Sequence, residues 1–226
     1  MSSTKPIKLY SHAGGPNPWK VAIMLNELDI PYETELMDFT KLHQEPFETT
    51  NPNGRVPAIE DPNTGITLFE SGAILEYLEE TYDKSNKFRY TSSPDKFLSQ
   101  SWLHFQTSGQ GPYFGQRAWF IFYHQEKGLT SVLDRYANEI RRVTGVLDAH
   151  LKKQGTQNLV GDKVTYADLA WVPWYWLIPA IMGEEGGMED LQKKFPTFAA
   201  WFDRLSARPA VKKAREDRDK AMKGGH

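Results

Sequence analysis

The sequence of 226 residues contains no cysteine. This absence excludes disulfide bonds, thiolate metal ligands and nucleophilic or redox chemistry by a sulfur atom of the chain itself. Any thiol chemistry in this protein must therefore use a thiol that a bound ligand supplies. Metal-ligand spacing is also lacking, so we expect no metal site. Four histidines are interpreted as structural or surface residues: His12, His104, His124 and His150.

Long apolar runs are absent too. No stretch approaches the ~20 apolar residues of a membrane span, and residues 1–10 lack the apolar core of a signal peptide. The formal net charge of −2 gives no electrostatic reason to expect nucleic acid or an anionic membrane as partner. The 39% hydrophobic content is enough for a packed core. We therefore expect a folded cytoplasmic protein that binds neither nucleic acid nor membrane.

The first third of the chain alternates strand and helix patterns. The expected strands are 7–10, 32–39, 55–59 and 66–69, and the expected helices are 19–28 and a second that starts near Ser71. This order, β-α-β, a loose segment and then β-β-α, is most economically one mixed sheet with helices against it. We assign it to a domain at residues 5–84.

The remainder of the chain reads as helical after a polar linker at 85–93. Ser93, Pro94 and Asp95 carry helix-start signals, and an apolar stripe at 131–153 follows. Thr165 and Asp168 match a capping box, which we interpret as structural. The last main helix should run from Pro196 to just before Pro209. The charge-mixed segment after it is expected to be a frayed or weakly docked tail of an all-helical domain at 94–226.

Pro57 lies inside a strand-like run, although proline lacks the amide that a sheet interior needs. One interpretation is an edge strand that tolerates it. The other is a cis Val56–Pro57 bond that turns the chain and leaves the backbone groups of Val56 free to pair with an extended peptide.

Glu70 and Ser71 stand where a helix should begin. Such a pair is most often only a cap. A helix N-terminus with free amides and a hydroxyl also makes a carboxylate site, and an adjacent glutamate can hold an ammonium group. Together with the backbone edge at Val56, the pair suggests a small peptide ligand with an α-amino-acid terminus.

Across residues 6–212 the sequence resembles the cytosolic glutathione transferases, which have a thioredoxin-like N-terminal domain followed by an all-helical domain. The motifs that carry the resemblance are NPNGRVPAI at 51–59, ESGAILEYL at 70–78 and GDKVTYADLA at 161–170. Three further stretches resemble one branch more closely, that of the fungal nitrogen-catabolite regulator and the bacterial nu-class disulfide reductases: SHAGGPNPWKVAIMLNEL, FQTSGQGPYFGQ and DRYANEIRRVTGVLD.

The resemblance implies a glutathione site made of residues from the first domain. Val56 would pair its backbone with the cysteinyl part, with Pro57 shaping the turn, and Glu70 and Ser71 would hold the γ-glutamyl head. His43 would lie near the glycyl carboxylate, although it can also be a loop histidine that faces solvent. Arg55 occupies a position that is often Lys or Arg in the family.

The expected catalytic position departs from the common pattern. Serine-type members carry Ser where this chain has Gly14, and the nu-class reductases carry Thr where it has Gly15. Asn17 matches the asparagine that this branch places beside the sulfur, and its amide can donate to a thiolate. Asn17 can alternatively be only a helix cap. Tyr10 and Ser11 are alternative hydroxyls for contact with the sulfur.

The second substrate is expected to bind against the helical domain. Candidates for lining its cleft are Tyr113, Phe114, Arg117 and Trp174, whereas Trp119, Phe120 and Phe122 are expected in the core.

The resemblance implies a homodimer that uses glutathione as co-substrate to attack electrophiles, disulfides or peroxides. The alternative is a non-catalytic glutathione-binding regulatory or ligand-holding protein. The sequence carries no long Asn/Gln-rich segment before its first strand, unlike the fungal regulator, and we take this to favour the enzyme.

Overall fold

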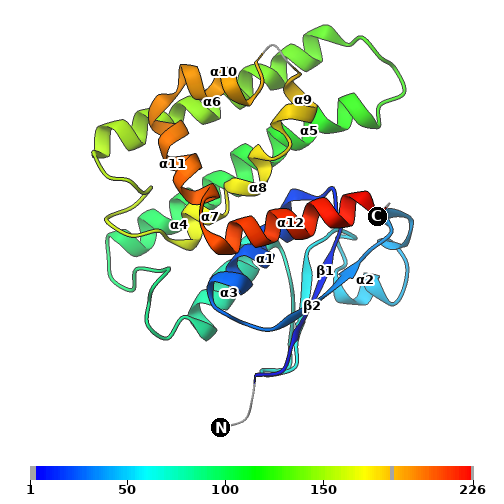
Figure 1. The fold of residues 1–226 in the computed structure, drawn as a ribbon. Coiled ribbons are helices and arrows are strands. Elements are labelled where there is room, and N and C mark those ends of the chain that lie inside the picture. The colour runs from blue at the N-terminus through cyan, green and yellow to red at the C-terminus, as the bar shows by residue number, and fades with distance from the viewer. Residues whose placement is uncertain (1–3, 184–185, 225–226) are drawn as a thin grey trace. The chain divides into compact units, whose positions relative to one another are not determined.

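Two distant segments of the sequence fold together into one unit, and the segment between them forms a second. A computed structural model describes residues 4–183 and 186–224. The first unit combines the chain up to Asn86 with the segment from Ser206 onward, and the second is Lys87–Leu205. Figure 1 shows the helices and strands of both units.

The first unit is built around a mixed sheet. Its strands are β1 (Ile7–Ser11), β2 (Tyr32–Leu36), β3 (Ala58–Asp61) and β4 (Ile66–Phe69), in the order β2-β1-β3-β4. β2 runs parallel to β1, while β3 is antiparallel to both β1 and β4. The helices of this unit are α1 (Pro16–Glu27), α2 (Phe47–Thr50), α3 (Ser71–Tyr82), α12 (Pro209–Lys223) and the 3-10 turn η1 (Phe39–Lys41). The predicted four-stranded, thioredoxin-like domain is therefore confirmed.

Each face of this sheet has its own apolar cluster. Residues of α1 and α3 that recur at helical spacing are fully buried, among them Val21, Ile23, Ile74, Leu75 and Leu78. A second cluster on the side of α2 contains Tyr10, Leu42, Phe47 and Ala58. Because strand side chains alternate between faces, Leu9 and Tyr10 belong to opposite sides of the sheet. The end of β1 therefore leads directly from the core into the loop at 12–15.

The C-terminal segment is a docked helix, so of the two expectations for it, a frayed or a weakly docked tail, the frayed tail was wrong. α12 packs on α1 and buries Ala210, Val211 and Ala214. Arg208, just before α12, forms an ion pair with Glu27 at the end of α1, and its Nη2 is 2.8 Å from Glu27 Oε2. The compact units thus place this segment with the first unit, whereas the sequence had suggested 94–226 as one domain.

The second unit is helical throughout its regular structure. Its elements are α4 (Asp95–Phe105), the π-helical turn η2 (Gln106–Gln110), α5 (Gly111–Phe122), α6 (Thr130–Gln154), α7 (Tyr166–Leu169), α8 (Val172–Tyr175), α9 (Ile178–Met182), α10 (Met188–Lys194) and α11 (Pro196–Ser206). α4 begins one residue later than the proline signal suggested, and Ser93 does not cap it. The all-helical second unit confirms the predicted fold class.

The predicted capping box is present at the start of α7 and holds the core of the helical unit. Asp168 is fully buried and accepts hydrogen bonds from the backbone N–H of Thr165 at 2.9 Å and of Leu159 at 2.9 Å. The indole of Trp201 donates to the same carboxylate at 3.0 Å. This box joins three segments of the helical core, as expected of a structural element. Within the described residues, no helix is long and apolar enough to cross a bilayer.

Candidate functional site

The loop before β3 carries the turn that Pro57 predicted. The Val56–Pro57 peptide bond is cis, and the register of β3 with β1 ends at Ala58. Val56 therefore lies just beyond the last paired position of the strand. Asn51, which is buried, holds this loop by donating to the carbonyl of Arg55 at 2.5 Å. Arg55 itself is exposed.

His43 lies directly against this loop. A Cβ atom built on Gly54 would stand 2.2 Å from His43 Nδ1, and Gly54 has a φ of +58°. Both the backbone conformation and the close approach therefore require glycine at this position. The ring of His43 is exposed to solvent, so it lies at the surface beside the Arg55–Pro57 segment. The structure thus brings the predicted residue His43 next to the loop that carries Arg55, Val56 and Pro57.

The start of α3 is the next part of the site. Glu70 precedes the helix with a φ of 71° and a ψ of 114°, and no side chain caps the helix. The first backbone N–H groups of α3 have no partner within the helix itself, as at every helix start. Glu70 is exposed and Ser71 is buried. The pair is not a side-chain cap, and the hydroxyl and amides at this terminus fit a carboxylate.

A buried lysine that the sequence analysis did not single out lies behind Ser71. Lys20 is 2% exposed, and its Nζ donates to Ser71 Oγ at 3.3 Å. Burial lowers the pKa of Lys20 to about 7, against the opposing effect of the Glu70 carboxylate. The contact joins α1 to the start of α3. The signal that could have found it is a lysine inside the apolar run WKVAIML.

Asn17 is the second residue of α1. The residue before the helix is Gly15, and Pro16 opens the helix. Asn17 therefore does not occupy the cap position, and the interpretation of Asn17 as the helix cap was wrong. Because no side chain caps α1, its N-terminus leaves positive potential beside Asn17. Asn17 is partly exposed.

The two other hydroxyls near the end of β1 are less suited to contact a ligand sulfur. Tyr10 donates to Glu60 Oε1 at 2.7 Å, and its ring packs on Phe47 on the α2 side of the sheet. Burial raises the pKa of the Tyr10 hydroxyl. Ser11 is 1% exposed, so its hydroxyl is shielded from solvent.

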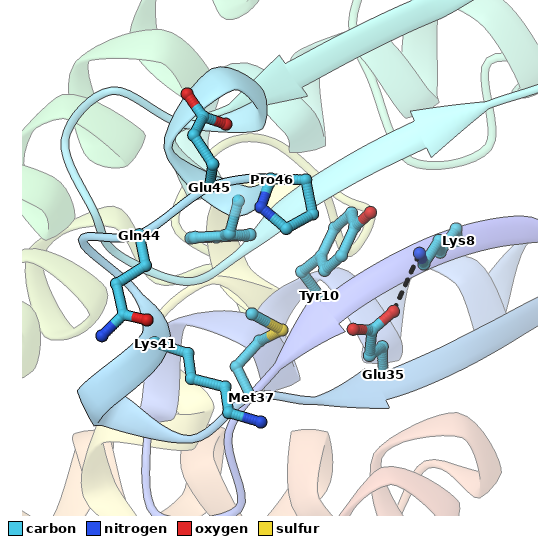
Figure 2. Close-up of a pocket in the computed structure, with 9 residues that line it drawn as sticks. Lys8, Tyr10, Glu35, Met37, Lys41, Gln44, Glu45 and Pro46 are labelled. Carbon is cyan, nitrogen blue, oxygen red and sulfur yellow. Dashed lines mark ion pairs between the residues drawn. The ribbon is translucent and has the colours of Figure 1, made fainter.

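A cavity of about 180 Å³ lies on the α2 side of the same sheet (Figure 2). Its walls carry charges of both signs, and Lys8 Nζ pairs with Glu35 Oε2 at 2.8 Å. The lining residues are Lys8, Tyr10, Glu35, Met37, Lys41, Gln44, Glu45, Pro46 and Phe47. None of the residues predicted for glutathione is among them. The cavity is therefore separate from the candidate site.

In the helical unit, the predicted second-substrate residues differ in their surroundings. Phe114 is fully buried and packs edge-on against Trp174 and Tyr175. Arg117 donates to the carbonyl oxygens of Ile181, at 2.5 Å, and of Leu133. Phe114 and Arg117 thus hold helices of this unit together. Trp174 is 7% exposed.

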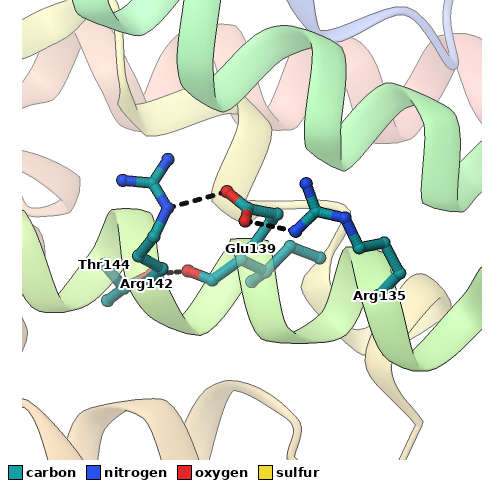
Figure 3. A network of polar contacts seen from close by, with 5 residues as sticks. Arg135, Glu139, Arg142 and Thr144 are labelled. Atoms are coloured by element: carbon teal, nitrogen blue, oxygen red, sulfur yellow. Dashed lines mark hydrogen bonds and ion pairs between the residues drawn. The ribbon is translucent and has the colours of Figure 1, made fainter.

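Tyr113, like Arg117, is partly exposed. The guanidinium of Arg142 lies over its ring, 6.0 Å from the centroid. Arg142 is itself held by Glu139 at 2.7 Å, and Arg135 binds the other oxygen of that carboxylate, as Figure 3 shows. The hydrogen bond from Arg142 lowers the pKa of Glu139. This network fixes a cation on one face of the Tyr113 ring.

Two aromatic residues expected in the core are at the surface. Trp119 is 45% exposed and Phe122 is 50% exposed, while Phe120 is partly buried and stacks on Tyr136. The glycine-rich, aromatic sequence of α5 has little periodicity, so its buried face could not be read from the pattern. Among the described residues, no group of three or more His, Asp or Glu side chains is arranged to hold a metal ion.

Comparison with known families identifies one family domain in each part of the chain. Residues 5–80 match the family described as "Glutathione S-transferase, N-terminal domain", and residues 112–209 match "Glutathione S-transferase, C-terminal domain". The "Glutathione S-transferase-like protein OpS6" of Beauveria bassiana is 49% identical over 94% of this chain and 96% of its own length. The "Transcriptional regulator URE2" of Saccharomyces cerevisiae is 36% identical over 91% of this chain and 66% of its length.

Solved structures with the same fold include ligand complexes. The glutathione transferase URE2P6 of Phanerochaete chrysosporium, in complex with oxidized glutathione, is 42% identical with a TM-score of 0.89 over 98% of this chain and 100% of that one. Ure2p5 of the same organism, cocrystallized with 1-(S-glutathionyl)-2,4-dinitrobenzene, is 37% identical with a TM-score of 0.88 over 98% of each chain.

Proposed function

The chain belongs to the glutathione S-transferase family, and from that premise we propose that it binds glutathione in the first unit and uses its thiolate to attack electrophiles, disulfides or peroxides. The observation that carries this proposal is the uncapped start of α3, where Ser71 and Glu70 stand next to a chain turned at cis-Pro57. This arrangement offers an amino-acid head group both of the charges it requires and offers a peptide a backbone edge.

Each predicted residue has a role in this proposal. The Ser71 hydroxyl and the first amides of α3 bind the α-carboxylate of the γ-glutamyl group, and Glu70 binds its ammonium group. The backbone of Val56, shaped by Pro57, pairs with the cysteinyl residue. His43 and Arg55, which lie on the same loop surface, bind the glycyl carboxylate.

Asn17 is the proposed catalytic residue. Its side-chain amide donates a hydrogen bond to the glutathione sulfur, and the N-terminus of α1 adds positive potential. Both interactions favour the thiolate over the thiol, and each unit of pKa depression corresponds to about 1.4 kcal/mol. Since Asn17 cannot accept the thiol proton as a base, that proton leaves to solvent. Activation is therefore electrostatic.

Two reactions follow from one thiolate. In conjugation, the sulfur forms a bond to an electrophilic carbon, and the leaving group departs with the bonding electron pair. In disulfide reduction, the sulfur attacks a disulfide sulfur and expels a thiolate, and a second glutathione resolves the mixed disulfide to oxidised glutathione. The relatives crystallised with a dinitrobenzene conjugate and with oxidized glutathione support conjugation and disulfide reduction, respectively. A peroxide is reduced in the same way, with attack on oxygen in the first step.

The second substrate is proposed to contact Tyr113, with Trp174 as a further wall and with Phe114 and Arg117 fixing their positions. The partly exposed Tyr113 ring and the cation held over it suit a flat, electron-poor substrate. We further propose a cytoplasmic homodimer, which size-exclusion chromatography with light scattering would test directly.

The alternative is a glutathione-binding regulatory or ligand-holding protein without useful turnover. The similarity to the transcriptional regulator URE2 favours this candidate. Purified protein would be assayed with glutathione and an aryl halide, and separately with glutathione and a mixed disulfide. Turnover of the aryl halide alone would eliminate the reductase. Tight glutathione binding with turnover of neither substrate would establish the regulatory candidate.

A further inference from the structure

The buried Lys20 side chain is an unusual feature of the first unit. It lies in the apolar stripe of α1, where the neighbouring side chains Val21, Ile23 and Met24 are fully buried. Removing an ammonium group from water is unfavourable unless charge or hydrogen bonds compensate. A lysine in this position therefore invites a functional explanation beyond packing.

The hydrogen bond between Lys20 and Ser71 determines where the hydroxyl proton of Ser71 can point. When Lys20 is charged, its ammonium group has only donors, so in the contact of 3.3 Å the Ser71 oxygen accepts. The hydroxyl proton of Ser71 is then left to donate to another acceptor. At the start of α3 no side chain caps the helix, so an acceptor that binds there can receive this proton together with the first backbone N–H groups.

We propose that Lys20 is a positioning residue of the glutathione site, which orients the Ser71 hydroxyl toward the α-carboxylate of the γ-glutamyl group and supplies the buried positive charge that this carboxylate meets. This inference rests on the proposed function, since it assigns the ligand of Ser71. Lys20 acts through Ser71 and through its charge.

Binding of the ligand should change the protonation of Lys20. Burial lowers the pKa of Lys20 to about 7, and the Glu70 carboxylate opposes this effect. A ligand carboxylate at Ser71 brings a second negative charge close to Lys20 and raises its pKa further. Near neutral pH, binding of the ligand is therefore accompanied by uptake of a proton.

Other charged groups lie on the elements that pack against α1. On β1, Lys8 pairs with Glu35. On α12, Arg215 and Arg218 pair with Asp219, and Lys213 pairs with Asp217. On α3, the remaining charged side chains are Glu76, Glu79 and Glu80, of which Glu79 is buried. The charged group that acts on Lys20 in the folded protein is Glu70, which directly precedes α3.

The decisive experiment is isothermal titration calorimetry of the wild-type protein with S-methylglutathione, in two buffers of different ionisation enthalpy at pH 7.5. Methylation removes the titration of the ligand thiol. We expect uptake of roughly 0.5 proton, because a group with a pKa near 7 is mostly neutral at this pH and becomes mostly charged when its pKa rises by about one unit.

The matched ligand is the same peptide with 4-aminobutyryl in place of γ-glutamyl, which lacks only the α-carboxylate. We expect it to bind at least about 10-fold more weakly and with no proton uptake. Equal uptake for both ligands would assign the proton to another group and would overturn the proposal. No uptake with S-methylglutathione would overturn it too.

A variant gives an independent readout. In Lys20→Met, checked for folding by circular dichroism, we expect S-methylglutathione to bind about 10- to 100-fold more weakly and the proton uptake to vanish. The matched ligand should bind the variant and the wild type equally, and kcat should change less than KM. An unchanged dissociation constant for S-methylglutathione would contradict the role of Lys20.

The ligand comparison on the wild type needs no variant, so it decides the matter even where the substitution prevents folding. Failure of the wild-type protein to bind S-methylglutathione at all would instead contradict the proposed function. Binding without proton uptake would contradict only the role of Lys20.

Discussion

Two helix starts in this molecule combine an acid with a hydroxyl and use them in opposite ways. At the start of α7, Thr165 and Asp168 form a capping box whose carboxylate accepts hydrogen bonds from three segments of the core. At the start of α3, Glu70 and Ser71 form no side-chain cap, and Glu70 is exposed. Side chains of the protein satisfy the first terminus, whereas no side chain caps the second, where we propose that a ligand binds.

The difference shows why a sequence pair of this kind cannot be assigned from its residue types. An acid three residues after the hydroxyl can reach back to the backbone N–H of the cap, which gives the closed box of α7. An acid directly before the hydroxyl cannot make that reciprocal contact. The spacing between acid and hydroxyl therefore distinguishes a helix start that the protein caps from one that can bind an anion. The substitutions below test capped and uncapped helix starts in turn.

The largest effect is expected for Asp168→Asn. The amide replaces one acceptor oxygen by a donor and leaves a buried N–H without a partner at Leu159, Thr165 or Trp201. We expect the free energy of unfolding to fall by about 3–5 kcal/mol, measured by chemical denaturation. The exposed Asp203→Asn is the matched control and should change it little. Equal stability of Asp168→Asn and the wild type would show that the box is not structural.

The next effect concerns the lysine behind Ser71 and depends on pH. Lys20 has a pKa of about 7 in the folded protein against 10.5 as its ordinary value, so the unfolded chain binds the extra proton between these pH values. Stability is therefore lost as pH falls from about 10 to 7. We expect the wild type to lose up to about 1.4 kcal/mol per pH unit in this window relative to Lys20→Met.

Urea denaturation of both proteins at pH 7, 8 and 9, without ligand, measures this difference. A constant difference in the free energy of unfolding across these pH values would mean that Lys20 stays charged in the folded protein throughout, as it does in the unfolded chain. The start of α3 would then have no titrating lysine behind Ser71.

The third effect tests the other uncapped helix start, that of α1. Asn17→Ala removes the amide that we place beside the sulfur. We expect kcat to fall by roughly 10- to 100-fold, while the dissociation constant for glutathione changes less than about threefold. Steady-state kinetics and calorimetry on the same preparation measure the two quantities. Wild-type kcat in this variant would remove Asn17 from catalysis.

The smallest effect is expected for Glu70→Gly. Glu70 has a φ of 71°, a backbone conformation that glycine adopts without a steric penalty. We expect the free energy of unfolding to rise by about 0.5–1 kcal/mol and glutathione to bind more weakly, because its ammonium group loses a partner. Glu70→Gln, which keeps the side-chain length and the backbone, is the control and should weaken binding without a gain in stability. A loss of stability in Glu70→Gly would contradict the assignment of strain.

Much of the fold could be predicted from the sequence because its signals are local. The strand and helix periods of the first unit, the proline at Val56–Pro57 and the Thr165–Asp168 spacing each act within a few residues, and the structure confirms them. The stripe of α6 is likewise buried at Ile140, Val143 and Leu147.

The parts that could not be predicted depend on contacts between distant residues. Lys20 does not disturb the apolar pattern of α1, so its burial against Ser71 shows only when α1 and α3 are placed side by side. α12 presents a short stripe of small residues among many charges, and only its contact with α1 reveals that it is docked. The exposure of Trp119 could not be predicted for a different reason, because the sequence of α5 has little periodicity.

The docking of α12 has a consequence for synthesis. A ribosome releases the sheet and the whole helical unit before it releases the helix that covers α1, so the first unit cannot complete its core cotranslationally until the last segment emerges. The helical unit has no such dependence, because its residues form one continuous stretch. A nascent chain would therefore finish the later unit before the earlier one, and a premature stop before Arg208 would leave α1 without α12 and without the partner of Glu27.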